Sequence, residues 1–226
     1  MNRRLFCFWT DSNPMPPERL KALEGMKRSG LSVEFITQRN LNDWIIKESP
    51  LHPAYPFLSA IHRADYLRVY FMHHYGGGYA DIKYINSSWI PSWDNLFDSD
   101  KWAVGYREIG PRGVAMVPSI SYLRLLWNWK YLIGNGAYIF KPGTDFTNEW
   151  LNLSNHFLNN KLVELTSNPA KVPEDYKGRL DGDRRSLYPI RWSELLGNIF
   201  HPLCLKYSEM INYDLPRPNF YINYDI

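Results

Sequence analysis

Residues 64–84 read ADYLRVYFMHHYGGGYADIKY, and this stretch decides how we expect the chain to fold. Within 57–75 the apolar residues recur at spacings of three and four, which predicts a helix with one core-facing side. Three glycines then end the run, and glycine allows the backbone to reverse sharply. The alternating residues that follow predict a strand end carrying two opposite charges, Asp81 and Lys83.

The segments before this helix predict a parallel sheet. Residues 5–10 are an apolar run, residues 18–30 have the pattern of an amphipathic helix, and residues 31–37 are β-branched and apolar. Strand, helix and strand over about 30 residues form a βαβ unit with a right-handed crossover. Ligands of such sheets bind beyond the carboxyl ends of the strands. Trp9 and Thr10 lie at one such end.

The later segments continue the alternation of strands and helices. We expect strands at 102–106, 114–117 and 137–142, and helices at 121–133, 145–158 and 191–207. A polar stretch rich in proline lies between the last two helices, from 165 to 189. The pattern predicts a single α/β domain over residues 1–226, with a mostly parallel, Rossmann-like sheet flanked by helices.

The composition excludes several classes of protein. The net charge of +3 comes from scattered basic residues, so we expect no nucleic-acid partner. No apolar run reaches 18 residues, so we expect no transmembrane segment, and the apolar run near the N-terminus is too short for a signal peptide. Cys7 and Cys204 have apolar neighbours and fit reduced, buried thiols. We therefore expect a cytoplasmic protein; its oligomeric state is left open.

The charged residues around the glycines are candidates for a site. Asp65 and Arg68 are three residues apart and lie on one helix face. The glycine run lacks the phosphate-loop pattern and follows a helix instead of opening one. An Asp-x-Asp pair at a strand end would hold a divalent cation against a diphosphate, but Lys83 stands in place of the second acid.

A second acidic pair is a literal Asp-x-Asp. Asp181 and Asp183 flank a glycine, but no apolar strand precedes them and two arginines follow. This context favours a turn with local ion pairs over a metal site, although the pair remains a candidate for the acceptor side. The adjacent His73 and His74 point apart on a helix, so we expect a solvated pair and not metal ligands.

The pattern A-D-x-L-R, followed after about a dozen residues by G-G-x-Y-x-D, resembles the donor site of GT-A glycosyltransferases. The closest resemblance is to glycosyltransferase family 32, which includes yeast-type mannosyltransferases and capsular polysaccharide synthesis proteins. It covers residues 5–142, including an opening strand that ends in a tryptophan near prolines. The resemblance implies a GT-A fold and transfer of a sugar from a nucleotide-sugar donor, UDP- or GDP-linked, to a carbohydrate hydroxyl of a glycan acceptor, with retention of configuration.

The resemblance also assigns roles to particular residues. Residues 1–90 would form the donor half and 100–211 the acceptor half, with 212–226 as a tail packed on the domain. Trp9 and Thr10 would contact the nucleobase, and Asp81 and His201 would hold a divalent metal, Mn²⁺ or Mg²⁺. The other residues that it places on the donor side or in catalysis are Asp65, Arg68, Gly77, Tyr79, Lys83 and Asn135.

Other interpretations of these residues stay open. Trp9 could be plain core, Asp65 and Arg68 a structural ion pair, and His201 a helix-end residue without a ligand. An inverting mechanism would use Asp183 or Glu194 as base. The missing second acid also leaves room for a nucleotide-sugar or carbohydrate-binding protein of the same fold with degraded chemistry. A glycoside hydrolase has less support, because sequence does not place two acids at the required separation.

Overall fold

The first strand-helix-strand unit is confirmed by the structure. The computed structural model describes residues 2–118 and 121–225. In it β1 (Arg4–Trp9) pairs in parallel with β2 (Ser32–Thr37), and α1 (Pro17–Gly25) connects the two strands. Their register places Trp9 beside Thr37, so both strands end at the same edge of the sheet.

The strands form one six-stranded sheet in the order β2-β1-β3-β5-β4-β8. The further strands are β3 (Gly77–Ala80), β4 (Ala103–Arg107), β5 (Ile133–Phe140) and β8 (Ile211–Asn212). β1 pairs in parallel with both β2 and β3, and β4 pairs in parallel with β8. β5 runs antiparallel to both of its neighbours, β3 and β4. The chain is therefore a single α/β domain whose sheet is mostly parallel.

The glycine run explains how the chain passes from helix to strand. α2 (Ala60–His74) begins at Ser59, whose hydroxyl accepts a hydrogen bond from the backbone N–H of His62. Gly76 has φ +62°, and a Cβ there would lie 2.5 Å from Cδ of Pro142. Gly77 has φ +91°, a conformation that residues other than glycine rarely adopt. The glycines thus reverse the chain so that β3 pairs beside β1 and is followed directly by Asp81.

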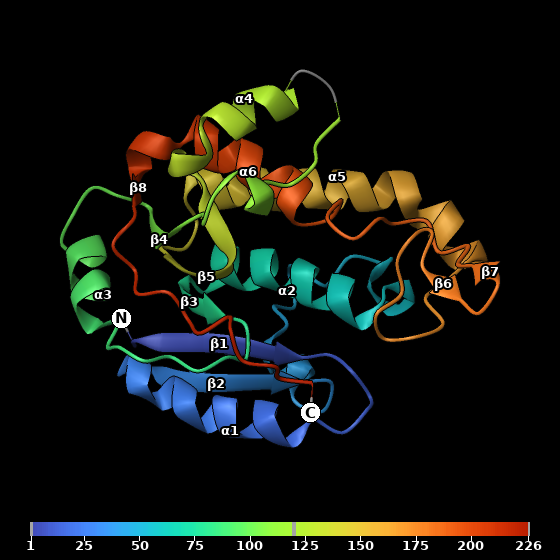
Figure 1. Cartoon of the computed structure of the whole chain (residues 1–226), viewed down its shortest axis with the longest axis horizontal. Helices are drawn as coiled ribbons and strands as arrows, with labels where there is room; N and C mark the ends of the chain where they lie inside the picture. The colour runs from blue at the N-terminus through green and yellow to red at the C-terminus, as the bar shows by residue number, and fades with distance from the viewer. Residues whose placement is uncertain (1, 119–120, 226) are drawn as a thin grey trace.

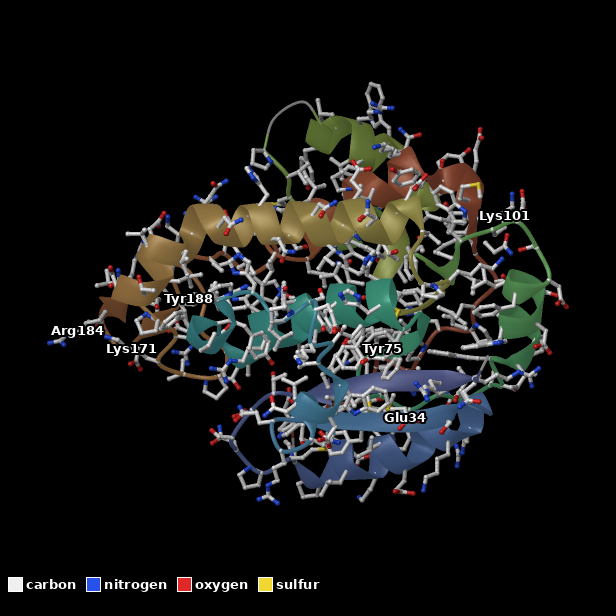
Figure 2. All side chains as sticks on the ribbon, turned by 180° about the vertical axis from the view of Figure 1, so that it is seen from behind. Glu34, Tyr75, Lys101, Lys171, Arg184 and Tyr188 are labelled. Atoms are coloured by element: carbon white, nitrogen blue, oxygen red, sulfur yellow. The ribbon has the colours of Figure 1, made fainter. Side chains whose placement is uncertain are left out.

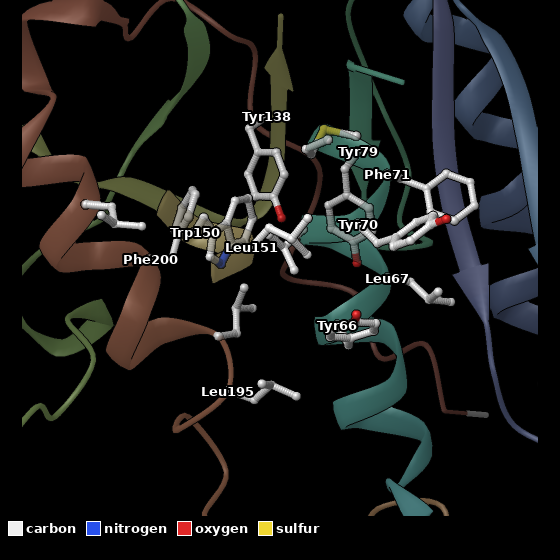
Figure 3. Packing of buried hydrophobic residues seen from close by; sticks show 14 of the residues in the cluster. Tyr66, Leu67, Tyr70, Phe71, Tyr79, Tyr138, Trp150, Leu151, Leu195 and Phe200 are labelled. Atoms are coloured by element: carbon white, nitrogen blue, oxygen red, sulfur yellow. The ribbon is translucent and has the colours of Figure 1, made fainter. Parts of the chain in front are cut away.

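Helices cover both faces of the sheet. α2, α5 (Asp145–Ser167) and α6 (Gly197–Lys206) share one hydrophobic cluster with β1, β3 and β5. Figure 1 shows α2 lying between β1 and α5. Figure 3 shows side chains that fill this face, among them Tyr66, Tyr70 and Phe71 of α2, Tyr79, Tyr138, Trp150 and Phe200. The high aromatic content of the chain is largely used here, in packing.

The opposite face is covered by α1, α3 (Ile90–Phe97) and the C-terminal tail, which we define as residues 213–225. The tail runs from β8 across the sheet toward β1 (Figure 1). Leu215 and Tyr224 are buried in the cluster on this face. These two side chains tie the tail to the rest of the chain. Cys7 and Cys204 are buried free thiols, as expected.

Several predicted elements have different bounds. Residues 114–117 belong to no strand; Val114 and Val117 are buried without pairing. The predicted helix at 121–133 is shorter, because α4 (Ser121–Trp127) ends where the side chain of Asn128 donates to the carbonyl oxygen of Arg124. α5 extends to Ser167, beyond its predicted end, and α6 starts only at Gly197. None of the described helices is both long and apolar enough to cross a membrane.

Candidate functional site

Arg68 of α2 stands at the centre of a charged cluster. Its guanidinium donates to Oδ1 of Asp81 at 3.2 Å and to the carbonyl oxygen of Asn135 at 3.1 Å. Oδ1 of Asp65 lies 3.7 Å from Nη2 of Arg68, the atom that also donates to Asp81. The guanidinium also stacks over the ring of Tyr79 at 4.5 Å. One arginine therefore joins α2, the end of β3 and the start of β5.

Asp81 follows β3 and faces Arg68. Its backbone N–H donates to the carbonyl oxygen of Gly136, which continues the β3–β5 pairing by one residue. Oδ1 of Asp81 accepts from the hydroxyl of Tyr79 at 2.7 Å as well as from Arg68. Tyr79 is itself buried. Tyr79 thus positions Asp81, and the side chain of Asp81 is still 26% exposed.

Asp65 is a buried carboxyl group beside the same arginine. Burial raises the pKa of Asp65 to about 7; the Arg68 guanidinium lowers this pKa, and the charge of Asp81 raises it. The Asp65 carboxyl therefore changes its charge near neutral pH. Perturbed acids in a cleft are candidates for functional sites.

Two cavities meet at this cluster, and Arg68, Asp81 and Asn135 line both of them. The larger has a volume of about 540 Å³ and reaches Asp65, the loop at 111–116 and the segment 192–197. The smaller has a volume of about 250 Å³ and is lined by Tyr106, Glu108, Ile109, Gly136, Arg217 and Phe220 in addition. Cavities of this combined size accept small organic ligands. The sequence correctly groups Asp65, Arg68, Asp81 and Asn135 at one place.

A third cavity opens at the carboxyl end of β1. It has a volume of about 180 Å³, and Thr10, Gln38 and Ser59 are among its lining residues. Thr10 is buried, and its hydroxyl donates to the carbonyl oxygen of Ala60. Trp9 points to the other face of the sheet, where it packs in the α1 cluster and its indole N–H donates to the carbonyl oxygen of Asn13. The structure therefore places Thr10, and not Trp9, at this cavity.

His201 lies apart from the carboxylates at which it was predicted to act. Its side chain is fully buried in α6, and Nδ1 accepts from the backbone N–H of Ala115. Burial lowers the pKa of His201 to about 4, so the ring is neutral and its proton is on Nε2. Nε2 lies 3.9 Å from Oε2 of Glu108. The histidine lines neither of the two cavities that Asp81 lines.

Lys83 is held by the tail. Its ammonium lies 4.8 Å from the ring centre of Tyr224 and 5.2 Å from that of Phe220. Burial lowers the pKa of Lys83, and the negative charge of Asp81 raises it. Lys83 lines neither cavity at Asp81. Lys83, which stands where the Asp-x-Asp pattern would have its second acid, therefore lies under the tail and not in the cleft.

Three further predicted residues do not reach the cleft. Gly77 packs against the carbonyl oxygen of Arg4, at the amino end of β1, and lines neither cavity at Asp81. Asp181 and Asp183 flank the turn of an exposed hairpin formed by β6 (Leu180–Asp181) and β7 (Arg184–Arg185). Figure 2 shows Arg184 at the outer edge of the molecule. The turn is confirmed; no ion pair of Asp181 or Asp183 is present among the described contacts, and neither residue lines a cavity at Asp81.

His73 and His74 lie outside the cleft, whereas two residues of the tail, which the sequence did not suggest for the site, line it. Burial lowers the pKa of His73 and of His74, and neither lies near the cleft. Arg217 and Phe220 of the tail line the smaller cavity, although sequence reasoning treated the tail as packing only. One feature of the sequence could have indicated Arg217 as a site residue. In Pro216-Arg217-Pro218, a proline on each side of the cationic residue restricts its backbone.

The residues at Asp81 do not fit a resident divalent cation. Mg²⁺ and Mn²⁺ prefer oxygen ligands, and Mg²⁺ commonly uses one or two carboxylates together with water and substrate phosphates. Here Oδ1 of Asp81 is taken by Arg68 and Tyr79, the second acid is a lysine, and His201 is turned toward Ala115 and Glu108. Within residues 2–118 and 121–225, no three His, Cys, Asp or Glu side chains are grouped so as to hold a metal ion. The two predicted ligands of Mn²⁺ or Mg²⁺, Asp81 and His201, are thus not brought together, and the metal stays a prediction.

Comparisons with known proteins add no assignment to this geometry. No protein-family model matches the chain, and no curated protein matches it significantly. The resemblance to GT-A glycosyltransferases therefore stays a prediction.

Proposed function

We propose that this protein transfers a sugar from a nucleotide-sugar donor to a hydroxyl group of a carbohydrate acceptor. The observation that supports this most is the cluster of Asp65, Arg68 and Asp81, which meets Asn135 at the junction of two cavities. Carboxylates accept hydrogen bonds from sugar hydroxyls, and a guanidinium stabilises negative charge. The cleft lies past the carboxyl ends of β1 and β3, where ligands of α/β sheets bind.

The cluster suits the charge that develops during such a reaction. When the bond between sugar and diphosphate breaks, negative charge builds on the phosphate oxygens, and fixed cations nearby lower the barrier. Arg68 is buried and remains charged, because the charges of Asp81 and Asp65 and the ring of Tyr79 favour its protonated form. Its position is fixed by two hydrogen bonds and a stacked ring, so little reorganisation is needed.

The cavity at Thr10 is our candidate for the nucleobase. Gln38 donates to the carbonyl oxygen of Thr10 at 2.6 Å, which fixes one wall. Thr10 and Ala60 join the end of β1 to the start of α2. Since Asp65 and Arg68 lie further along α2, a nucleotide bound at Thr10 would extend its sugar toward them.

The larger cavity has an aromatic wall that suits an acceptor. Trp192 lines this cavity and is 56% exposed, and Tyr122 and Met116 lie on the same lining. Exposed aromatic rings pack against the apolar faces of sugars. We therefore move the acceptor side from Asp181 and Asp183 to Trp192.

An inverting mechanism would use Asp183 or Glu194 as base, and neither residue lies in the cleft. Asp183 lies on the exposed hairpin, and Oε2 of Glu194 accepts from the backbone N–H of Arg191. Neither residue lines the cavities at Asp81. Transfer with retention of configuration, as the resemblance implies, stays our proposal.

A binding protein with degraded chemistry is the second candidate, and the presence of Lys83 in place of an acid favours it. Both candidates predict binding of a nucleotide sugar, and only the first predicts turnover. The first experiment is a screen of nucleotide sugars for thermal stabilisation, with Asp81→Asn beside the wild type. Asp94→Asn is the matched control, because Asp94 pairs with Arg3 at the surface. We expect one donor to raise the melting temperature of the wild type and of the control but not of Asp81→Asn. No stabilisation by any nucleotide sugar would contradict both candidates.

A further inference from the structure

Hydrogen bonds on both sides of Arg217 hold the tail, one to β4 and one to the loop after β3. The backbone N–H of Leu215 donates to the carbonyl oxygen of Gly105, and that of Asn219 donates to the carbonyl oxygen of Tyr84. The hydroxyl of Tyr224 donates to the carbonyl oxygen of Asn219 at 2.6 Å. Arg217 itself stands between two prolines, which restrict its backbone. The fold therefore holds this arginine in one place beside Asp81.

Arg217 is a cation without an anion. It lines the smaller cavity together with Arg68, Asp81 and Glu108. No carboxylate of the described chain lies within 4.0 Å of its guanidinium, and its Nε atom is buried without a hydrogen-bond partner. A guanidinium has five donors in a planar fork that matches phosphate oxygens. Arg217 lines the cavity, so a ligand with acceptor oxygens bound there would satisfy donors of this fork.

Two acids, Asp81 and Glu108, line the same cavity as Arg217. Asp81 is paired with Arg68. Glu108 is buried, and its Oε1 accepts from the backbone N–H of Ile109. Burial raises the pKa of Glu108, whereas the hydrogen bond from Ile109 and the charge of Arg217 lower it. Among the described residues, the basic groups within 4.0 Å of these two acids are thus Arg68 and His201, and Arg217 is not one of them.

Lys83 takes part through the ring of Phe220. Lys83 and Arg217 both stack on this ring, with the Arg217 Cζ atom 4.7 Å from its centre. Phe220 lies over Gly136, where a Cβ would come within 2.6 Å of the ring. Cations attract aromatic faces, and more strongly where water is excluded. Lys83 thus anchors the ring on which Arg217 rests.

We propose that Arg217 binds the diphosphate of the donor in place of a divalent cation, and that Lys83 is a positioning residue that holds Arg217 there through Phe220. This inference rests on the proposed function, whose substrate carries a diphosphate. It also accounts for the unusual lysine: the position that would bind a metal instead anchors a cation of the tail.

The test is titration calorimetry with inorganic pyrophosphate at fixed ionic strength, in the presence of a chelator. We expect the wild type to bind without any metal, and Arg217→Ala to bind at least tenfold more weakly. Arg107→Ala is the matched control, because Arg107 also stacks on a tail residue, Tyr213, but does not line the smaller cavity. The control should bind as the wild type does. If the alanine variant does not fold, Arg217→Lys serves, with binding several-fold weaker because lysine lacks the planar fork.

Lys83 is tested by a pair of variants. Lys83→Met should weaken pyrophosphate binding, and Lys83→Arg, which keeps the cation on Phe220, should restore it. A purely structural lysine would change stability without this rescue. Pyrophosphate binding that needs a divalent metal, or that is unchanged in Arg217→Ala, would overturn the inference.

The outcome for the proposed function is read separately. Sugar transfer by a protein whose pyrophosphate binding ignores Arg217 would leave the function standing and remove the inference. Metal-free binding of pyrophosphate that depends on Arg217, in a protein that turns over no nucleotide sugar, would support the inference and contradict the proposed transfer.

Discussion

Replacement of Arg68 by methionine should destabilise the protein, because it removes the partner of two carboxylates. The change keeps an apolar stem and deletes two hydrogen bonds from a charged donor, to Asp81 and to the carbonyl oxygen of Asn135. Hydrogen bonds to charged groups contribute about 1.5–3 kcal/mol each. Asp81 is partly exposed and regains water, so we expect the low end, a loss of about 3 kcal/mol at pH 8 in total.

The loss should depend on pH through Asp65. The folded-state pKa of Asp65 is already raised to about 7, and removal of the guanidinium raises this pKa further. The folded variant then binds a proton that the unfolded chain releases above its lower pKa, so its stability falls as the pH rises. We expect a smaller loss at pH 5 than at pH 8, and the double variant Asp65→Asn/Arg68→Met should recover part of the loss at pH 8.

Urea unfolding at the two pH values measures these differences. Arg3→Met is the control, because it breaks an exposed pair with Asp94 and should cost no more than about 1 kcal/mol. A loss at pH 8 in Arg68→Met no greater than that of the control would refute the view that one buried arginine holds the two acids together.

Three other changes test separate parts of the structure. Burial lowers the pKa of His62 to about 4, below its unfolded value of 6.5, so its contribution to stability is lost as the pH falls through this window. Between these pH values, His62→Gln should remove a slope of about 1.4 kcal/mol per pH unit from the plot of unfolding free energy against pH. An unchanged slope would refute the neutral, buried state of His62. Gly136→Ala would put a methyl group 2.6 Å from Phe220 and 3.2 Å from Oδ2 of Asp81, and should cost about 1–3 kcal/mol in urea unfolding; a neutral effect would contradict the packing of the tail on the sheet. Trp192→Ala should raise the KM for the acceptor and leave donor binding unchanged, and the opposite result would move the acceptor elsewhere.

The sequence predicts the parts of the fold that rest on local periodicity. The first βαβ unit and the helix before the glycines are correct because their apolar spacing matches their burial. Residues 114–117 failed as a strand because a short apolar run predicts burial and not pairing. The antiparallel direction of β5 also depends on distant partners, which no local pattern reveals.

The residues of the site likewise fall into those that the sequence indicates and those that only the tertiary structure reveals. Asp65 and Arg68 share a helix face, and Asp81 follows the next strand, so their grouping could be inferred from spacing and resemblance. Trp9 was predicted to contact the nucleobase, but alternation along β1 puts its side chain on the α1 face and not at the cavity of Thr10. Arg217 reaches the cleft from more than a hundred residues away in sequence, through contacts of the tail with β4 and Tyr84. Such a contact requires the tertiary structure.

The central claim is that the cleft at Asp81 transfers a sugar, and the most direct measurement is product formation. The wild type and Asp81→Asn are incubated with the stabilising nucleotide sugar and a panel of oligosaccharides, and free nucleoside diphosphate and glycosylated product are quantified. We predict equal amounts of the two products from the wild type, and a rate reduced at least a hundredfold, or about 2.7 kcal/mol in barrier, in a folded Asp81→Asn variant. Donor binding without release of nucleoside diphosphate by the wild type would contradict the claim and identify a binding protein.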